Sequence, residues 1–160
     1  MFRALPKRGG HSMGSCIYHP ELSQVLSHTH IPVEGGPKYW TVYLWTNGKA
    51  LQKARDCHGD KCSTAVKGLT CPESFTLRRD GTVDASDELG EIHFAVGEWD
   101  EEIVSHECQH ASQQCRRVLQ INPDASVDEE ERLCYLTGKL TKAVYRWLWR
   151  LDPDMWWAYR

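Results

Sequence analysis

The sequence has no apolar run approaching the ~20 residues that a helix needs to span a bilayer, so no transmembrane segment is expected. Its basic amino terminus lacks an apolar stretch behind it and does not resemble a secretory signal. An excess of one charge sign is also missing, because 19 Lys and Arg oppose 22 Asp and Glu. We therefore expect no binding to nucleic acid or to an anionic membrane, and we expect a cytoplasmic location.

The seven cysteines lack the C-x2-C spacing that is typical of zinc ribbons. Three of them lie in a polar region together with His58, namely Cys57, Cys62 and Cys71. This spacing leaves two interpretations open, a structural metal site or free thiols with an adventitious disulfide. Three others fall in predicted helices, namely Cys108, Cys115 and Cys134. There a buried thiol acts as a small hydrophobic side chain.

The length of 160 residues predicts a single domain over 1–160. The first ~37 residues are rich in Gly, Pro, Ser and His, which favours loops with one short helix near 21–27. His28 and His30 lie in this segment, one residue apart. They are either a metal site or two solvated side chains.

Strands are predicted at 39–45, 75–78 and 91–96, from β-branched and aromatic runs or from a following turn signal. The pattern at 50–55 fits either a strand or a helix. A long helix is predicted over 99–121, which lacks Gly and Pro and opens with acidic residues. After a break at 122–124, the capping box at 126–129 predicts a second helix to about residue 151. The expected class is α+β, with a small mixed or antiparallel sheet followed by two long helices.

Residues 106–110 read His-Glu-Cys-Gln-His and fit the pattern H-E-x-x-H. On a helix, His106 and His110 project from the same face, so both imidazoles can reach one Zn²⁺. Glu107 is then positioned to take a proton from a metal-bound water. The simpler alternative is a pair of exposed histidines that hydrogen-bond to water.

A catalytic zinc ion that keeps an open position for water needs a third protein ligand. The second predicted helix opens with Glu129, Glu130 and Glu131, and a short connection makes it an antiparallel neighbour of the first. Glu131 is the preferred ligand because Cys134 and Gly138, on its face, are small and would let the helices approach closely. Glu130 is the alternative, since Glu129 is expected to cap the helix.

The run His106-Glu107-Cys108-Gln109-His110, followed by Glu131-Arg132-Leu133-Cys134, resembles the gluzincin branch of the zincin metallopeptidases. The compact size resembles the small zincin-like proteins of bacteriophages and prophages. The resemblance covers roughly 91–149, within an expected metal-binding core at 91–150. It implies His106, His110 and Glu131 as ligands of one zinc ion and Glu107 as general base. It further implies that the strand at 91–96 is an edge strand over the active-site cleft, where it could pair with an extended peptide.

The sequence lacks the third histidine of the metzincin pattern, with Gln113, Arg116 and Arg117 standing in that region instead. The predicted function is a zinc-dependent metallopeptidase that hydrolyses peptide bonds with a zinc-activated water. A hydrogen-bond donor to the transition state is also expected. Three residues remain open for this role, namely His93, Tyr135 and Tyr145.

The alternative function is a zincin-fold binding protein that retains zinc but is weakly active or inactive, such as a phage-type factor that acts on a host protein. The expected partner is a peptide or protein substrate. The pattern does not determine the oligomeric state.

Overall fold

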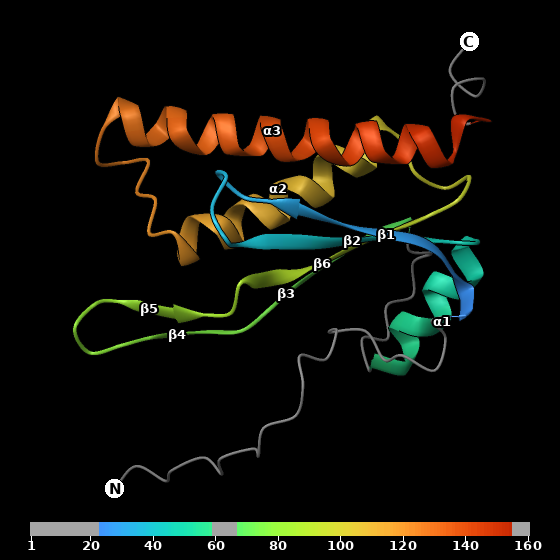
Figure 1. Cartoon of the computed structure of the whole chain (residues 1–160), viewed down its shortest axis with the longest axis horizontal. Helices are drawn as coiled ribbons and strands as arrows, with labels where there is room; N and C mark the ends of the chain where they lie inside the picture. Colours follow the sequence, from blue (N-terminus) through green and yellow to red (C-terminus); the bar gives the residue numbers. More distant parts are fainter. Residues whose placement is uncertain (1–22, 59–66, 155–160) are drawn as a thin grey trace, which may run out of the picture.

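The computed structural model of the protein describes residues 23–58 and 67–154. The elements follow in the order β1 (Val25–Pro32), β2 (Tyr39–Trp45), α1 (Gly48–His58), β3 (Gly68–Pro72), β4 (Phe75–Leu77), β5 (Val83–Ala85), β6 (Glu88–Ala95), α2 (Glu101–Val118) and α3 (Val127–Leu151). The predicted α+β class is confirmed, with a small mixed sheet and two long helices at the carboxyl end (Figure 1). None of the helices in the described ranges is long and apolar enough to cross a membrane.

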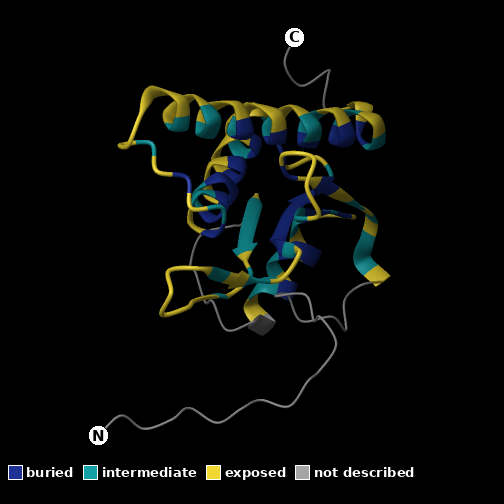
Figure 2. Cartoon of the chain, turned by 60° about the vertical axis from the view of Figure 1, so that its left-hand side comes forward, coloured by how far each residue is buried: buried dark blue, intermediate teal, exposed yellow. Residues whose placement is uncertain are grey.

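The main sheet has four strands in the order β1-β2-β6-β3. The β1–β2 and β6–β3 pairs are antiparallel, whereas β2 and β6 run parallel. Strands β4 and β5 form a separate hairpin beyond the sheet (Figure 1). Helices α2 and α3 cover one face of the sheet, and α1 packs on the other face. Most of the buried residues lie between the sheet and the two long helices, and the outer side of α3 is exposed (Figure 2).

Two of the helical cysteines belong to this core, as predicted. Cys108 and Cys115 are fully buried on α2, and the indole N–H of Trp40 donates to Cys115 Sγ at 3.3 Å. Burial raises the pKa of the Cys108 thiol to about 12 and that of Cys115 to about 11, so both stay protonated near neutral pH. Cys134, in contrast, is exposed on α3.

Helix α3 begins where the predicted capping box places it, whereas α2 begins two residues after its predicted start at residue 99. The Asp100 carboxylate accepts a hydrogen bond from the Ile103 amide at 2.7 Å and caps α2. Ser126 Oγ accepts from the Glu129 amide at 3.2 Å and caps α3. The carboxylate of Glu129 accepts from the amide of Asn122 at 3.2 Å, so it also tethers the connection between the helices.

The prediction of loops up to residue 37 is wrong for Val25–Pro32, which forms edge strand β1, while residues 1–22 lie outside the described ranges. Pairing with the aromatic strand β2 imposes the extended conformation, which the polar sequence does not reveal. His28 and His30 are exposed on β1, stacked on Tyr43 and Tyr39 with ring centroids 5.8 and 4.6 Å apart. Residues 50–55, for which the sequence fitted either a strand or a helix, are helical. The Asn47 side chain caps α1 by accepting a hydrogen bond from the Ala50 amide.

The strand predicted at 91–96 forms as β6, but it is not an edge strand. It lies between β2 and β3 and is buried on both faces, and the edge next to α2 is β3. Two polar residues of β6, Glu91 and His93, are nonetheless buried and interact with each other. His93 Nε2 lies 3.1 Å from Glu91 Oε2, and the indole N–H of Trp45 donates to His93 Nδ1 at 3.1 Å. The sequence offers no strand signal for β3, which is short and contains Gly68 and Pro72.

Asp152 joins the end of α3 to the segment that precedes α2. Its Oδ2 atom accepts hydrogen bonds from the Gly97 amide and from the Trp99 indole N–H, each at 3.0 Å. Because Asp152 and Trp99 are buried, water cannot readily replace either bond.

We expect Asp152→Ala to lower the free energy of unfolding by about 2–4 kcal/mol, since two donors lose their acceptor at once. Urea denaturation at neutral pH measures this loss. Asp154→Ala is the matched control, because Asp154 is exposed nearby, and it should change stability by no more than about 0.5 kcal/mol. Equal unfolding midpoints for the two variants would contradict the role of Asp152.

Candidate active site

A groove runs between edge strand β3 and helix α2. Its cavity is about 350 Å³ and is lined by Thr70 and Pro72 from β3 and by Glu107, His110, Gln113 and Arg117 from α2, among others. The strand can approach the helix because Gly68 has no side chain. A Cβ atom there would lie 2.8 Å from Ile103 Cγ2 and 2.9 Å from Glu107 Cγ, distances that real Cβ atoms do not tolerate. The groove therefore depends on glycine at this position.

The structure brings His106 and His110 together on the exposed side of α2. Their Nε2 atoms are 3.1 Å apart, and their ring centroids are 4.7 Å apart. Two nitrogens bound to one tetrahedral zinc ion at its usual bond lengths lie about 3.3 Å apart. The two imidazoles thus already converge almost as a shared zinc ion requires. Without a metal, the N–H of one ring can donate to the nitrogen of the other.

Glu107 is buried at the wall of the groove, with 7% of its surface exposed. Its Oε2 accepts a hydrogen bond from the Thr70 hydroxyl at 2.6 Å, and the same hydroxyl lies 3.0 Å from the Glu107 carbonyl oxygen. The carboxylate is therefore held by the neighbouring strand, beside the histidine pair. Sequence reasoning did not identify Thr70, because only the pairing of β3 with β6 brings it to the helix.

The structure does not bring Glu131 to the histidine pair. No three His, Cys, Asp or Glu side chains form a potential metal-binding group in the part of the chain that the structure describes, and Glu130 and Glu131 are exposed. The start of α3 is instead tied to the turn after β1. Glu34 accepts two hydrogen bonds from Arg132, each at 2.8 Å, and the Arg132 guanidinium lowers the pKa of that carboxyl. The ligand role of Glu131 stays a prediction.

The small residues expected to bring α3 close to α2 do not do so. Cys134 is exposed, and a Cβ atom built at Gly138 would have no neighbour within 4 Å. The face of α3 that packs inward carries Leu136, Leu140 and Val144. The apolar side chains decide the orientation of the helix, so the small residues point to solvent.

The three candidate donors lie away from the groove. His93 points to the opposite face of the sheet, where it stacks on Tyr43 with centroids 5.0 Å apart. Tyr145 packs edge-on against Trp99 with centroids 6.3 Å apart. Tyr135 is 66% exposed and lines a different cavity.

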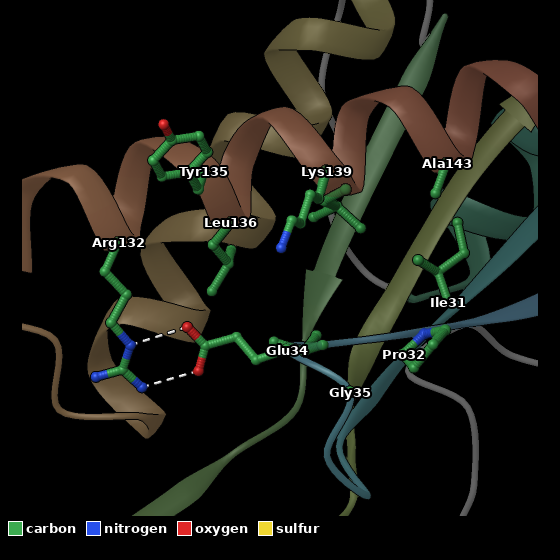
Figure 3. A pocket seen from close by; sticks show the side chains of 11 residues that line it. Ile31, Pro32, Glu34, Gly35, Arg132, Tyr135, Leu136, Lys139 and Ala143 are labelled. Carbon is green, nitrogen blue, oxygen red and sulfur yellow. Dashed lines mark hydrogen bonds and ion pairs between the residues drawn. The ribbon is translucent and has the colours of Figure 1, made fainter.

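That second cavity is about 720 Å³ and lies between α3 and the end of β1, at the sheet edge opposite β3. Its apolar side chains include Leu136 and Ile31, while Glu34 and Arg132 close one end (Figure 3). In this view Lys139 reaches into the cavity (Figure 3). It is the larger of the two cavities, but His110 and Glu107 line the smaller one.

The cysteine cluster lies only partly within the described residues. Cys62 lies outside the described residues, and the side chain of Cys57 is not described. Cys71 is half-buried on β3, and its register partner on β6 is Glu91. Neither the structural metal nor the free-thiol interpretation is tested.

In comparisons with known proteins, the chain matched no protein-family model, no curated protein and no solved structure. The resemblance to gluzincins accordingly rests on the motif itself. The geometry of His106, Glu107 and His110 beside an edge strand is compatible with it.

Proposed function

We propose that the chain is a zinc-dependent metallopeptidase whose active site is the groove between β3 and α2. The observation that carries this proposal is the 3.1 Å separation of the His106 and His110 Nε2 atoms, with Glu107 buried beside them and held by Thr70. A pair of convergent imidazoles and an oriented carboxylate, next to the edge strand β3, suits metal-assisted hydrolysis of a peptide.

In this proposal His106 and His110 hold one zinc ion. Glu131 is the proposed third ligand and Glu130 the alternative, although both are exposed and neither lies at the histidine pair in this structure, so zinc binding would have to bring one of them there. Bound zinc supplies a Lewis acid that polarises the scissile carbonyl and activates water for attack. Glu107 takes the proton from the attacking water and delivers it to the leaving amine. Thr70 positions the carboxylate of Glu107 by donating to Oε2.

The edge of β3 is suited to hold the substrate. β3 is the last strand in the sheet order of the described residues, so its outer backbone groups are not used by another strand there. An extended peptide can pair with these groups and lie along the groove, across His110 and Glu107. In this proposal β3 takes the role that the resemblance to gluzincins implied for 91–96.

We expect purified protein to contain about one zinc ion per chain, and we expect His110→Ala to lose it. Glu107→Gln should keep the metal but lower kcat on a peptide library by about 10²- to 10⁴-fold, the range for loss of a general base. Elemental analysis and a peptidase assay on the same preparations measure both effects. Zinc-free protein that is fully folded and active would overturn the proposal.

The third ligand is tested separately, by comparing Glu131→Gln with Glu130→Gln. We expect the Glu131 variant alone to weaken zinc binding, because one of three metal bonds is lost. Competition with a chelator reports the affinity without depending on catalysis. If neither substitution weakens binding, the first turn of α3 does not contribute a ligand.

Thr70→Val should lower kcat by roughly ten-fold and leave the zinc content unchanged, because it removes the donor to a buried carboxylate while keeping the side-chain shape. Thr70→Ser is the matched control. It retains the hydroxyl and should stay within about two-fold of the wild type. A Val variant as active as the Ser variant would show that Glu107 needs no such support.

A second candidate is a zinc-retaining binding protein with little or no peptidase activity. The observation that favours it is the position of His93, Tyr135 and Tyr145, which all lie away from Glu107. Under this alternative, wild type and Glu107→Gln should bind zinc and a protein partner equally well, and neither should cleave the library. A difference in cleavage between the two proteins decides for the peptidase.

A further inference from the structure

Arg117 lines the groove and is the cationic side chain on which this inference rests. Its guanidinium takes part in no hydrogen bond or ion pair within residues 23–58 and 67–154. The preceding residue, Arg116, points elsewhere and lies 3.9 Å from the Asp124 carboxylate. Glu107 is the carboxylate among the lining residues, and it is already engaged by Thr70. The groove therefore offers at one end a positive charge that has no ion-pair partner among the residues that the structure describes.

The position of Arg117 along the groove follows from helix geometry. It lies seven residues after His110, which is two turns or about 10 Å along the axis. Strand β3 runs in the same direction as α2. Gly68 packs against Glu107, and the carbonyl of Glu73, just after β3, accepts from the Gln114 side chain at 2.7 Å. Arg117 therefore lies at the Pro72 end of the groove.

A peptide added to an edge strand pairs antiparallel more often than parallel, and antiparallel pairing is slightly more stable. Antiparallel to β3, its amino-terminal part lies at the Pro72 end, beside Arg117. An extended chain rises about 3.3 Å per residue, so about 10 Å corresponds to three residues. The residue beside Arg117 is then about the third before the bond that lies beside His110.

We infer that Arg117 selects peptides with an acidic side chain two to four residues before the cleaved bond. This inference rests on the proposed function and deepens it by naming the substrate class. The planar guanidinium binds a carboxylate through two parallel hydrogen bonds, which a neutral amide side chain cannot reproduce with the same strength. The contact is remote from the reacting atoms, so we expect Arg117 to affect how tightly the peptide binds rather than the rate of the chemical step.

The test uses a set of otherwise neutral peptides that carry Asp, Asn or Lys at each position on both sides of the cleaved bond. The wild type should prefer Asp over Asn about ten-fold in kcat/KM at the third position before the bond, mainly through KM. Arg117→Glu should reverse the preference toward Lys. Arg116→Glu is the matched control, since Arg116 does not line the groove, and it should keep the preference for Asp.

A binding measurement separates this inference from the proposed function. A fluorescent acidic peptide is titrated into zinc-loaded Glu107→Gln protein and into the same protein carrying Arg117→Glu. Loss of binding in the second protein supports the inference even if the wild type cleaves no peptide. Absence of cleavage by the wild type would contradict only the proposed peptidase activity. Equal binding, or equal preferences in the wild type and Arg117→Glu, overturns it and leaves Arg117 as a residue that only stabilises the end of α2.

Discussion

The contact between strand β3 and helix α2 is the constraint on which the candidate site depends. Without a side chain at Gly68, the strand comes close enough for Thr70 to donate to Glu107. That single hydrogen bond fixes the carboxylate at the wall of the groove. The same approach leaves β3 beside His110, across the groove. A bulkier residue at Gly68 would displace the strand, the carboxylate and the groove together.

The rest of the fold holds α2 in place for this contact. Near its carboxyl end, Cys115 packs into the core and accepts from the Trp40 indole. Before its amino end, Gly97 and Trp99 donate hydrogen bonds to Asp152 at the end of α3. The helix is thus fixed to the sheet and to the last helix at different points. A rigid helix matters for a metal site, because two ligands on adjacent turns converge only while the helix keeps its geometry.

The orientation of α3 shows how tertiary interactions compete with a local motif. Arg132 binds Glu34 across the molecule, and Leu136 and Leu140 turn inward. The adjacent Glu131 therefore projects to solvent, and the small residues Cys134 and Gly138 do so as well. Packing of the long apolar face decides which side of α3 faces the core. The sequence of α3 contains both the acidic first turn and the apolar face, and the tertiary packing shows that the apolar face faces the core.

Local chemistry in the sequence determined the helices, their caps at Asp100 and Ser126, and the pairing of His106 with His110, because helix periodicity and capping act within a few residues. Tertiary structure decided which strand lies along α2, because Thr70 and Glu107 are far apart in the chain and meet only through the pairing of β3 with β6. It likewise decided that His93 faces away from the groove and that Glu131 is exposed. Those outcomes depend on side chains that meet across elements, which no local pattern encodes.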